Sequence, residues 1–594
     1  MPIQPLPIFT YYDKQRFTQF GAMDCANWYG IQVESGKKQQ ALYPAMGRRH
    51  VNFLGQNRLV FDAEPREVFR TINFMYVIVG TRVFQYDRFF NQKQIGNVAL
   101  TGSLSFAYLP VQGVVYALLT DESNVYIITE NGTAVTYDLC TDTNTPAKPQ
   151  RVAAFGNRFV VSTKDTPLNT LTRTNLGGVP LVPATIFTID DGGAGFALFF
   201  SSSGIVRAYA VLHSQLYIFT DFTTDIWANI ATQITVAGVT REFPWKINTS
   251  YNWDYGIADP LSLSVDFGRM VFLAKNSNGL VSFMASNGGQ PEDISSQAIN
   301  VLLEQSSNED DGLNPFLRLT SDGFLYQYEN TIFYRVSAGL YDNTQLLDPA
   351  TTSANSIEYN FETGKWGRVI ELNGSRNRIQ KHVYFANKHL VTVQGDPAIY
   401  EMAGNIYHNE LRTPNTEEEA PNAFTKYPMR YELTTQQLYL EDYAEFIDDY
   451  VEIDFVFGDR TFYKNNAPFD NTVFIVDEDS TPEVPIYIMD EDSTEENPIF
   501  VIEDGTNTPA FDDNHYYALF KPHLELYYSD DGGTTFITAD LREFSPLGEY
   551  RWRMRWYELG ISRNRCYHLV AVSSSPIVIL GAVRNTRRAS GGAN

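Results

Sequence analysis

The sequence has few cysteines and no long hydrophobic run. Its three cysteines, Cys25, Cys140 and Cys566, are odd in number and spread over 594 residues, so disulfides are not expected to frame the fold. No apolar run reaches the roughly 18 residues of a membrane-spanning helix. The first thirty residues lack the basic and apolar regions of a signal peptide. We therefore expect a chain that folds in a reducing cytoplasm and has no membrane-spanning segment.

Basic residues are also scarce. The chain has 45 Lys and Arg against 70 Asp and Glu, a formal net charge of −25. A protein that grips nucleic acid by its phosphates needs a basic surface, so this composition argues against that class. It is compatible with a protein past which DNA slides without adhering.

Sequence motifs for catalysis and cofactor binding are missing as well. There is no P-loop, GxGxxG, HExxH, CxxC or G-x-S-x-G pattern, and the eight histidines form no cluster with metal-ligand spacing. His382 and His389 are seven residues apart in a strand region, where packing is the expected role. We expect no enzymatic activity and no cofactor.

Aromatic residues are abundant, at 14 per cent, which favours strands and predicts an all-β chain. From residue 56 to 405, short strands recur, and turn sequences such as Asn131-Gly132 and Asn276 to Gly279 separate pairs of them. This pattern is typical of β-propeller blades and predicts six or seven of them, with a pair of β-sandwiches as the alternative. One helix is expected at 295–304, with Ser295 as its N-cap.

The segments on either side of the propeller have different compositions. Residues 1–55 have few strand signals and several prolines, which suggests an extended N-terminal arm lying over a neighbouring molecule. Residues 406–426 are polar and predict a linker. Residues 427–470 and 510–585 alternate as strands of an antiparallel C-terminal β module, and 586–594 are expected to form a flexible tail.

An acidic repeat interrupts the C-terminal module. Residues 474–481 recur at 487–494 and, more weakly, at 500–507, and residues 471–509 hold many acids and no Lys or Arg. We expect these units to stack as an inserted lobe. Asp477, Asp479, Asp490 and Asp492 could bind a cation such as Ca²⁺, and a solvated acidic tip is the alternative.

The stretch around 529–536 fits the Asp-box pattern, S-x-D-x-G-x-T-aromatic. Its members are Ser529, Asp531, Gly533, Thr535 and Phe536. In this tight hairpin we expect Asp531 to accept backbone N–H groups across the turn, and Phe536 to close the hairpin base.

Arginines are concentrated after residue 550. Arg551, Arg553 and Arg555 alternate with Trp552, Met554 and Trp556, so one strand face is basic and the other apolar. Contact with DNA is one interpretation. In a chain this acidic, we favour contacts to carboxylates of a neighbouring subunit, made by the members of the set Arg551, Arg553, Arg555, Arg563 and Arg565.

The order of these motifs resembles one known family. The Asp-box, the Arg/Trp strand, Arg563-Asn564-Arg565 and the run 576–582 occur in the order seen in the tail-hub or nozzle ("packaged DNA stabilisation") proteins of short-tailed bacteriophages. The first seven residues, the stretch 25–29 and the stretch 41–44 resemble the same family's N-terminal part. Near residue 46 the family usually has Pro-Gly, where this chain has Met46-Gly47.

The resemblance implies a structural protein of the virion tail, assembled in the bacterial host cytoplasm. It implies a homo-hexameric ring below the portal and adaptor, with tail fibres or tailspikes at its side and double-stranded DNA passing through the lumen. The acidic lobe would then form the channel tip, with Asp477, Glu478, Asp490, Glu491, Glu503 and Asp504 at the opening. Asp-boxes also occur in sialidases, so a carbohydrate-binding or glycan-hydrolysing propeller is the alternative.

Overall fold

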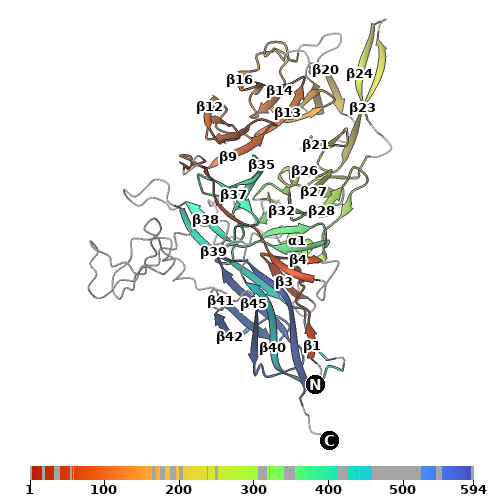
Figure 1. The fold of residues 1–594 in the computed structure, drawn as a ribbon. Coiled ribbons are helices and arrows are strands. Elements are labelled where there is room, and N and C mark those ends of the chain that lie inside the picture. Colours follow the sequence, from red (N-terminus) through yellow and green to blue (C-terminus); the bar gives the residue numbers. More distant parts are fainter. Residues whose placement is uncertain are drawn as a thin grey trace, which may run out of the picture.

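The computed structural model contains a ring of β-sheets and a second β module below it, in the view of Figure 1. The structure describes residues 3–15, 21–32, 40–53, 56–57, 59–163, 169–173, 181–187, 195–199, 205–236, 239–247, 252–305, 318–319, 321–339, 355–412, 424–440, 442–457, 523–543 and 551–589.

Four successive sheets of four antiparallel strands form the first blades of the ring. Blade 1 contains β9 (Pro65–Arg70), β10 (Met75–Val79), β11 (Arg82–Tyr86) and β12 (Gln92–Asn97). Blade 2 contains β13 (Ser105–Val111), β14 (Val114–Thr120), β15 (Val125–Asn131) and β16 (Ala134–Leu139). Blade 3 contains β17 (Pro149–Phe155), β18 (Arg158–Thr163), β19 (Asn169–Arg173) and β20 (Gly195–Phe199). Blade 4 contains β21 (Ala208–Leu212), β22 (Gln215–Phe219), β23 (Thr224–Val236) and β24 (Val239–Ile247).

Three further blades complete the ring: blade 5 is a sheet of its own, and blades 6 and 7 are the two ends of a 16-stranded sheet that continues through the C-terminal module. Blade 5 contains β25 (Tyr255–Ile257), β26 (Ser264–Asp266), β27 (Arg269–Asn276) and β28 (Val281–Ser286), with β29 (Glu292–Asp293) at its edge and the short helix η1 (Pro260–Ser262) between β25 and β26. Blade 6 contains β31 (Phe324–Tyr328), β32 (Thr331–Gly339), β33 (Asn355–Asn360) and β34 (Lys365–Arg368), with β30 (Arg318–Leu319) beside β32. Blade 7 contains β35 (Ile379–Phe385), β36 (Lys388–Val393), β37 (Ile399–Ala403) and β6 (Gly47–His50).

The seven blades close into a propeller, which confirms the predicted fold class. Each pair of neighbouring blades shares a cluster of buried apolar side chains. The cluster between blades 7 and 1 joins Val383 and Leu390 to Val68 and Val77, so the last blade meets the first. The expected turns are present, with Gly132 and Gly279 at positive φ where the hairpins reverse.

The predicted helix is α1 (Gln297–Gln305), which lies between blades 5 and 6. Its apolar face buries Ile299, Leu302 and Leu303 between them. The N-cap differs from the expectation, because the Ser296 hydroxyl accepts the N–H of Ile299 while Ser295 accepts the N–H of Phe283. Within the described ranges no helix has the length and hydropathy of a membrane span.

The C-terminal module consists of two sheets that pack face to face around one core. One sheet contains β1 (Ile3–Leu6), β4 (Trp28–Gln32), β5 (Gln40–Pro44), β46 (Ile577–Arg588), β40 (Phe446–Phe457), β43 (Arg551–Tyr557) and β44 (Ile561–Ser562). The other contains β2 (Asp13–Lys14), β3 (Ala22–Ala26), β39 (Phe424–Thr434), β45 (Cys566–Ser573), β41 (His523–Ser529) and β42 (Ile537–Glu543). Two small strands, β7 (Asn52–Phe53) and β8 (Gln56–Asn57), pair with each other.

The N-terminal segment differs from the expected extended arm. β1 pairs with β46 along Ile3–Leu6, β3 pairs with β39 and with blade 6, and β6 is the outer strand of blade 7. Leu6, Ile8 and Trp28 belong to the core of the C-terminal module. The prolines permit this, because edge positions of a sheet do not require every N–H. The N-terminal segment therefore joins the two parts of the molecule.

The expected linker also carries strands. β38 (His408–Arg412) pairs with β39 and, in parallel, with β6, so the outer edges of blades 6 and 7 continue into the C-terminal module. The expected tail begins later than predicted, because β46 extends to Arg588. The acidic repeat at 471–509 lies outside the described residues.

Candidate functional site

The end of the C-terminal module remote from the propeller gathers three loops, and β1 begins there in Figure 1. We call it the distal end and define it by the loops 435–445, 530–536 and 558–565. Hydrogen bonds connect the loops: Gln437 Nε2 donates to the Gly532 carbonyl at 3.1 Å, and Asn564 Nδ2 donates to Gln437 Oε1 at 3.1 Å. The distal end is therefore braced rather than formed of independent loops.

The Asp-box forms the turn between β41 and β42, as expected. Asp531 accepts the N–H groups of Thr534 and Thr535 at 2.9 Å, and the hydroxyls of Ser529 and Thr535 at 2.6 Å. Ser529 in turn accepts the N–H of Gly533 at 2.9 Å. Phe536 lies against the His568 ring with a centroid distance of 5.2 Å and stays partly exposed. The box is a structural turn in this chain.

The first prediction concerns this turn. Hydrogen bonds from Ser529 and Thr535 hold the pKa of Asp531 well below its usual range. We expect Asp531→Ala to lower the free energy of unfolding by about 1–2 kcal/mol at pH 7, because the variant loses hydrogen bonds to a charged acceptor. A depressed folded pKa contributes stability above the unfolded pKa, so the difference from wild type should shrink as the pH falls below about 4.

Urea unfolding at pH 7 and at pH 3 measures this difference. Asp540→Ala, on the exposed β42, is the control and should change little at either pH. A difference for Asp531→Ala that is the same at both pH values would contradict the assigned role of its carboxylate.

Arg565 differs from the expectation that it contacts a neighbour. Its side chain is fully buried and pairs with Asp530 at 2.8 Å, while Asp448 lies 3.8 Å away and the Tyr528 ring lies below the guanidinium. The buried Asp448 also accepts the Tyr567 hydroxyl at 2.5 Å. Arg565 therefore holds the distal end together from inside. Arg563 does lie at the surface, paired with Glu445 at 3.0 Å.

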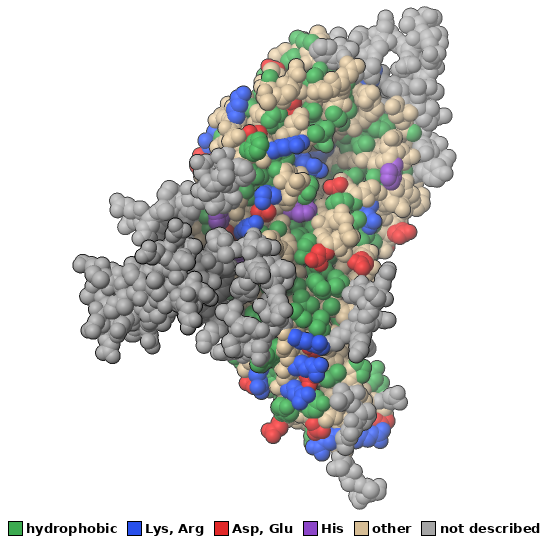
Figure 2. All heavy atoms as spheres, in the orientation of Figure 1, with side chains coloured by type: hydrophobic (Ala, Val, Ile, Leu, Met, Phe, Trp, Pro, Cys, Tyr) green, Lys and Arg blue, Asp and Glu red, His purple; other side chains and the backbone are tan. Residues whose placement is uncertain are grey.

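Arg551, Arg553 and Arg555 form an exposed row on β43, which we call the arginine row. Arg551 pairs with Asp454 at 2.8 Å, Arg553 reaches Glu452 at 3.7 Å, and Arg555 also pairs with Glu452. These carboxylates belong to β40 of the same chain, whereas the sequence suggested carboxylates of a neighbour. About half of each arginine side chain remains exposed, at 56, 58 and 49 per cent. In the view of Figure 2, basic side chains gather on the lower part of the molecule.

The acidic candidates cannot be placed in the same way. Asp477, Glu478, Asp479, Asp490, Glu491, Asp492, Glu503 and Asp504 all lie outside the described residues. Elsewhere, in the part that the structure describes, no three His, Cys, Asp or Glu side chains converge as metal ligands.

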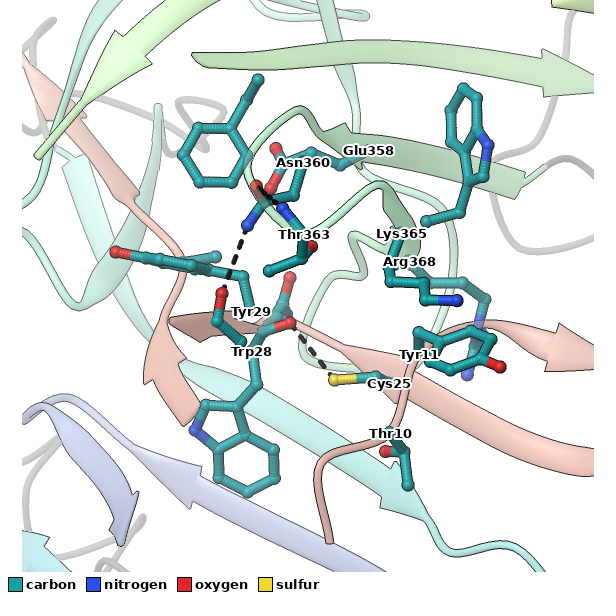
Figure 3. A pocket seen from close by; sticks show the side chains of 16 residues that line it. Thr10, Tyr11, Cys25, Trp28, Tyr29, Glu358, Asn360, Thr363, Lys365 and Arg368 are labelled. Carbon is teal, nitrogen blue, oxygen red and sulfur yellow. Dashed lines mark hydrogen bonds between the residues drawn. The ribbon is translucent and has the colours of Figure 1, made fainter. Parts of the chain in front are cut away.

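A small cavity of 30 Å³ lies where the C-terminal module meets blade 6 (Figure 3). Cys25 Sγ donates to the Trp28 carbonyl at 3.2 Å, and Asn360 Nδ2 donates to the Gly30 carbonyl at 3.3 Å. Arg368 on blade 6 pairs with both Asp24 and Glu432 of the module. The cavity has room for about two waters, so it is part of a packed joint rather than a site for an organic ligand.

The second prediction concerns the thiols. Burial raises the pKa of Cys25 to about 12 and that of Cys566 to about 11, and it also raises the pKa of Cys140. Since the thiolate is the reactive form, native protein at pH 8 should react with iodoacetamide at least about 100-fold more slowly than urea-unfolded protein. Mass spectrometry of the alkylated chain measures this, and rapid labelling of any of the three in native protein would contradict it.

Sequence reasoning missed a cluster of charges on the propeller axis. Lys381 of blade 7 pairs with Glu67 of blade 1 at 2.9 Å and with Asp322, next to blade 6, at 2.8 Å. Burial lowers the pKa of Arg151 on blade 3, and the negative charges of the same two carboxylates counteract this lowering. Blades 1 and 6 are not neighbours, and side chains from such blades can meet only at the axis of the propeller. This cluster of charges therefore lies at the axis. The residues lie far apart in the sequence, and no local pattern marks them.

His382 and His389 come together between blades 6 and 7. Their rings are joined by a hydrogen bond of 3.0 Å, and His382 stacks on Phe324. Burial lowers the pKa of both imidazoles. Both rings are packed between other side chains, which is the role that the sequence predicted for them.

The likeness of the chain to known proteins is weak and concerns its fold alone. No model of a known protein family matches the chain, and no curated protein matches it. Among solved structures it is similar to the β-propeller domain of Cps50 (Swd1) from Myceliophteria thermophila, at 8% identity and a TM-score of 0.34 over 60% of this chain and 99% of that one. It is also similar to the WD40 domain of SCAP from fission yeast, at 8% identity and a TM-score of 0.30 over 68% and 94%. At these scores the propeller assignment depends on the blades themselves.

Proposed function

We propose that the chain is a structural subunit of the tail hub, or nozzle, of a short-tailed bacteriophage. The proposal is carried by one observation: the separate stretches that resemble this family lie together in one module. Trp28 Nε1 donates to the Ile577 carbonyl at 2.9 Å, and the Trp28 ring stacks on Tyr431 at 5.1 Å. Stretches almost 550 residues apart therefore share one core, as expected for motifs that define a single structural unit.

Asn27 supports the same proposal. It lies in the left-handed region at φ 58°, which Asn tolerates better than most residues. Its side chain donates to the carbonyls of Ile370, after blade 6, and of Arg430, on β39. The resembling stretch 25–29 thus fixes the propeller to the C-terminal module, and a rigid joint of this kind suits a load-bearing subunit.

In the proposed role, six copies form a ring below the portal and adaptor, with fibres or tailspikes at the side. The net charge of −25 suits a lumen that repels phosphate, so that double-stranded DNA passes without adhering. The acidic repeat would surround the channel exit, where carboxylates repel one another unless a cation or a protein neutralises them.

The test is a phage carrying a stop codon early in this gene. We expect tail mass spectrometry to find the chain in wild-type particles, and particles made without it to lose packaged DNA. Complementation with the intact gene should restore retention. Particles that lack the chain and still retain and eject DNA would overturn the proposal. Specific binding on a glycan array, with the chain absent from virions, would instead favour the carbohydrate-binding alternative.

A further inference from the structure

β43 lies at the edge of its sheet. It pairs with β40 from Arg551↔Val456 to Tyr557↔Tyr450, and within the described ranges β40 is its sole strand partner. Met554 and Trp556 point into the core, while Arg551, Arg553 and Arg555 point outward. An edge strand of this kind presents unpaired N–H and C=O groups to which another extended segment can add.

The arginine row decides which segment can add. Three guanidinium groups share two carboxylates, those of Glu452 and Asp454, and these acids are nearly buried beneath them. The surface that reaches solvent is therefore basic. A second β43 would place Arg opposite Arg, which destabilises a strand pair, whereas an acidic strand would place carboxylates opposite the row. The outer edge of β43 therefore disfavours pairing with a second β43 and favours pairing with an acidic strand.

The rest of the chain supplies that chemistry. Acids outnumber Lys and Arg by 70 to 45, a net charge of −25, so a second copy of the chain carries an excess of carboxylates and is complementary in charge to this basic edge. A contact between two different surfaces of identical copies is heterologous, and such contacts generate a ring when the rotation from copy to copy closes.

We infer that the outer edge of β43 docks an extended acidic segment of a second copy of this chain, with its carboxylates on the arginine row. This inference rests on the proposed function, because it requires that copies of the chain lie side by side, and it names the surface through which they would contact each other. The contact is directional, because the basic edge of each copy receives the acidic segment of the next.

The test uses the full-length chain with Arg551, Arg553 and Arg555 all changed to Gln. The control changes Arg49, Arg82 and Arg207 to Gln, since these arginines are similarly exposed and ion-paired but lie elsewhere. Sedimentation velocity over a concentration series should show self-association of the wild type and of the control. The β43 variant should associate at least about tenfold more weakly. Raising the salt from about 0.05 M to about 0.5 M should weaken the wild type and change the β43 variant less.

Two further readouts keep the inference falsifiable. Circular dichroism should show that the β43 variant is folded, and hydrogen exchange of the 551–557 amides should slow when the wild type associates. Equal association of the variant and wild type, or no association at any concentration, would overturn the inference. So would loss of binding to a labelled DNA duplex with association unchanged, which would make the row a nucleic-acid site. The virion test judges the proposed function separately, so either can fail alone.

Discussion

Arg565→Met is expected to lower the free energy of unfolding by about 3 kcal/mol, because it removes two charge-assisted hydrogen bonds to Asp530 and one of the two guanidinium groups near the fully buried Asp448, where Arg584 remains at 3.8 Å. The chain offers a close control two residues away. Arg563→Met removes a pair with Glu445 between two exposed side chains, and should cost at most about 1 kcal/mol. Urea unfolding followed by tryptophan fluorescence measures the stability of both variants, because Trp28 and Trp556 lie in the core of the C-terminal module.

Arg565→Lys separates charge from geometry. Lys keeps the positive charge but cannot reproduce the two-pronged contact of Arg565 Nε and Nη2 with Asp530, so we expect a loss between those of Met and wild type. If Arg565→Met is as stable as Arg563→Met, the buried network does not support the distal end.

The second large effect is expected where the propeller closes. Arg48 on β6 is 1 per cent exposed and donates to both carboxylate oxygens of Glu371, at 2.8 and 3.0 Å. Arg48→Met should lower the free energy of unfolding by about 3–5 kcal/mol, because the nearly buried Glu371 carboxylate then lacks its guanidinium partner and keeps only the donors of Arg378 N–H and Asn409. Its neighbour Arg49 pairs at the surface with Glu401, and Arg49→Met should cost at most about 1 kcal/mol.

The pH dependence of this pair has a definite sign. Burial raises the pKa of Glu371, but the charge and hydrogen bonds of Arg48, together with the backbone N–H and the charge of Arg378, outweigh burial, so the pKa is lowered overall. The pair therefore stabilises the fold above the unfolded pKa of about 4, and this contribution is lost as the pH falls further. Thermal unfolding at pH 7 and pH 3 should show a smaller difference between wild type and Arg48→Met at pH 3. Adding Glu371→Leu to Arg48→Met should recover part of the stability, because no charge is then left buried. A double variant no better than the single one would contradict this account.

Local patterns predicted the local structure. Hairpins at Asn131-Gly132 and at Gly279, the helix after Ser295 and the Asp-box each depend on residues a few positions apart, where turn chemistry and periodicity act directly. The strand β6 has the sequence Gly-Arg-Arg-His, with no apolar alternation, so it resembles a loop until its partners β37 and β38 are known.

The candidate site was predicted less completely than the fold. Arg563 and Arg565 look alike in the sequence, yet one is 73 per cent exposed and the other is buried. The difference comes from Asp448, which β40 brings under the loop from more than one hundred residues away. Similarly, the prolines of the first seven residues suggested an extended arm lying over a neighbouring molecule, and only the edge of β46 explains why that segment is a strand of this chain's own sheet.

Strands from the beginning of the chain pair with strands that are translated much later, and this order has a consequence for synthesis. β6 cannot find β37 until some 350 further residues have been translated, and β1 must await β46, almost at the end of the chain. At about 5–20 residues per second, the first strands emerge from the ribosome up to two minutes before their partners exist. Blades 1 to 6 can form one after another during this time, and blade 7 can close the ring while the C-terminal module is still being translated, whereas the core of that module forms only after β46 has emerged. Chains released before β46 is made would keep β1 and one edge of β40 unpaired and should be removed by chaperones and proteases, so the pairing of β1 with β46 acts as a check on synthesis of the C-terminal module.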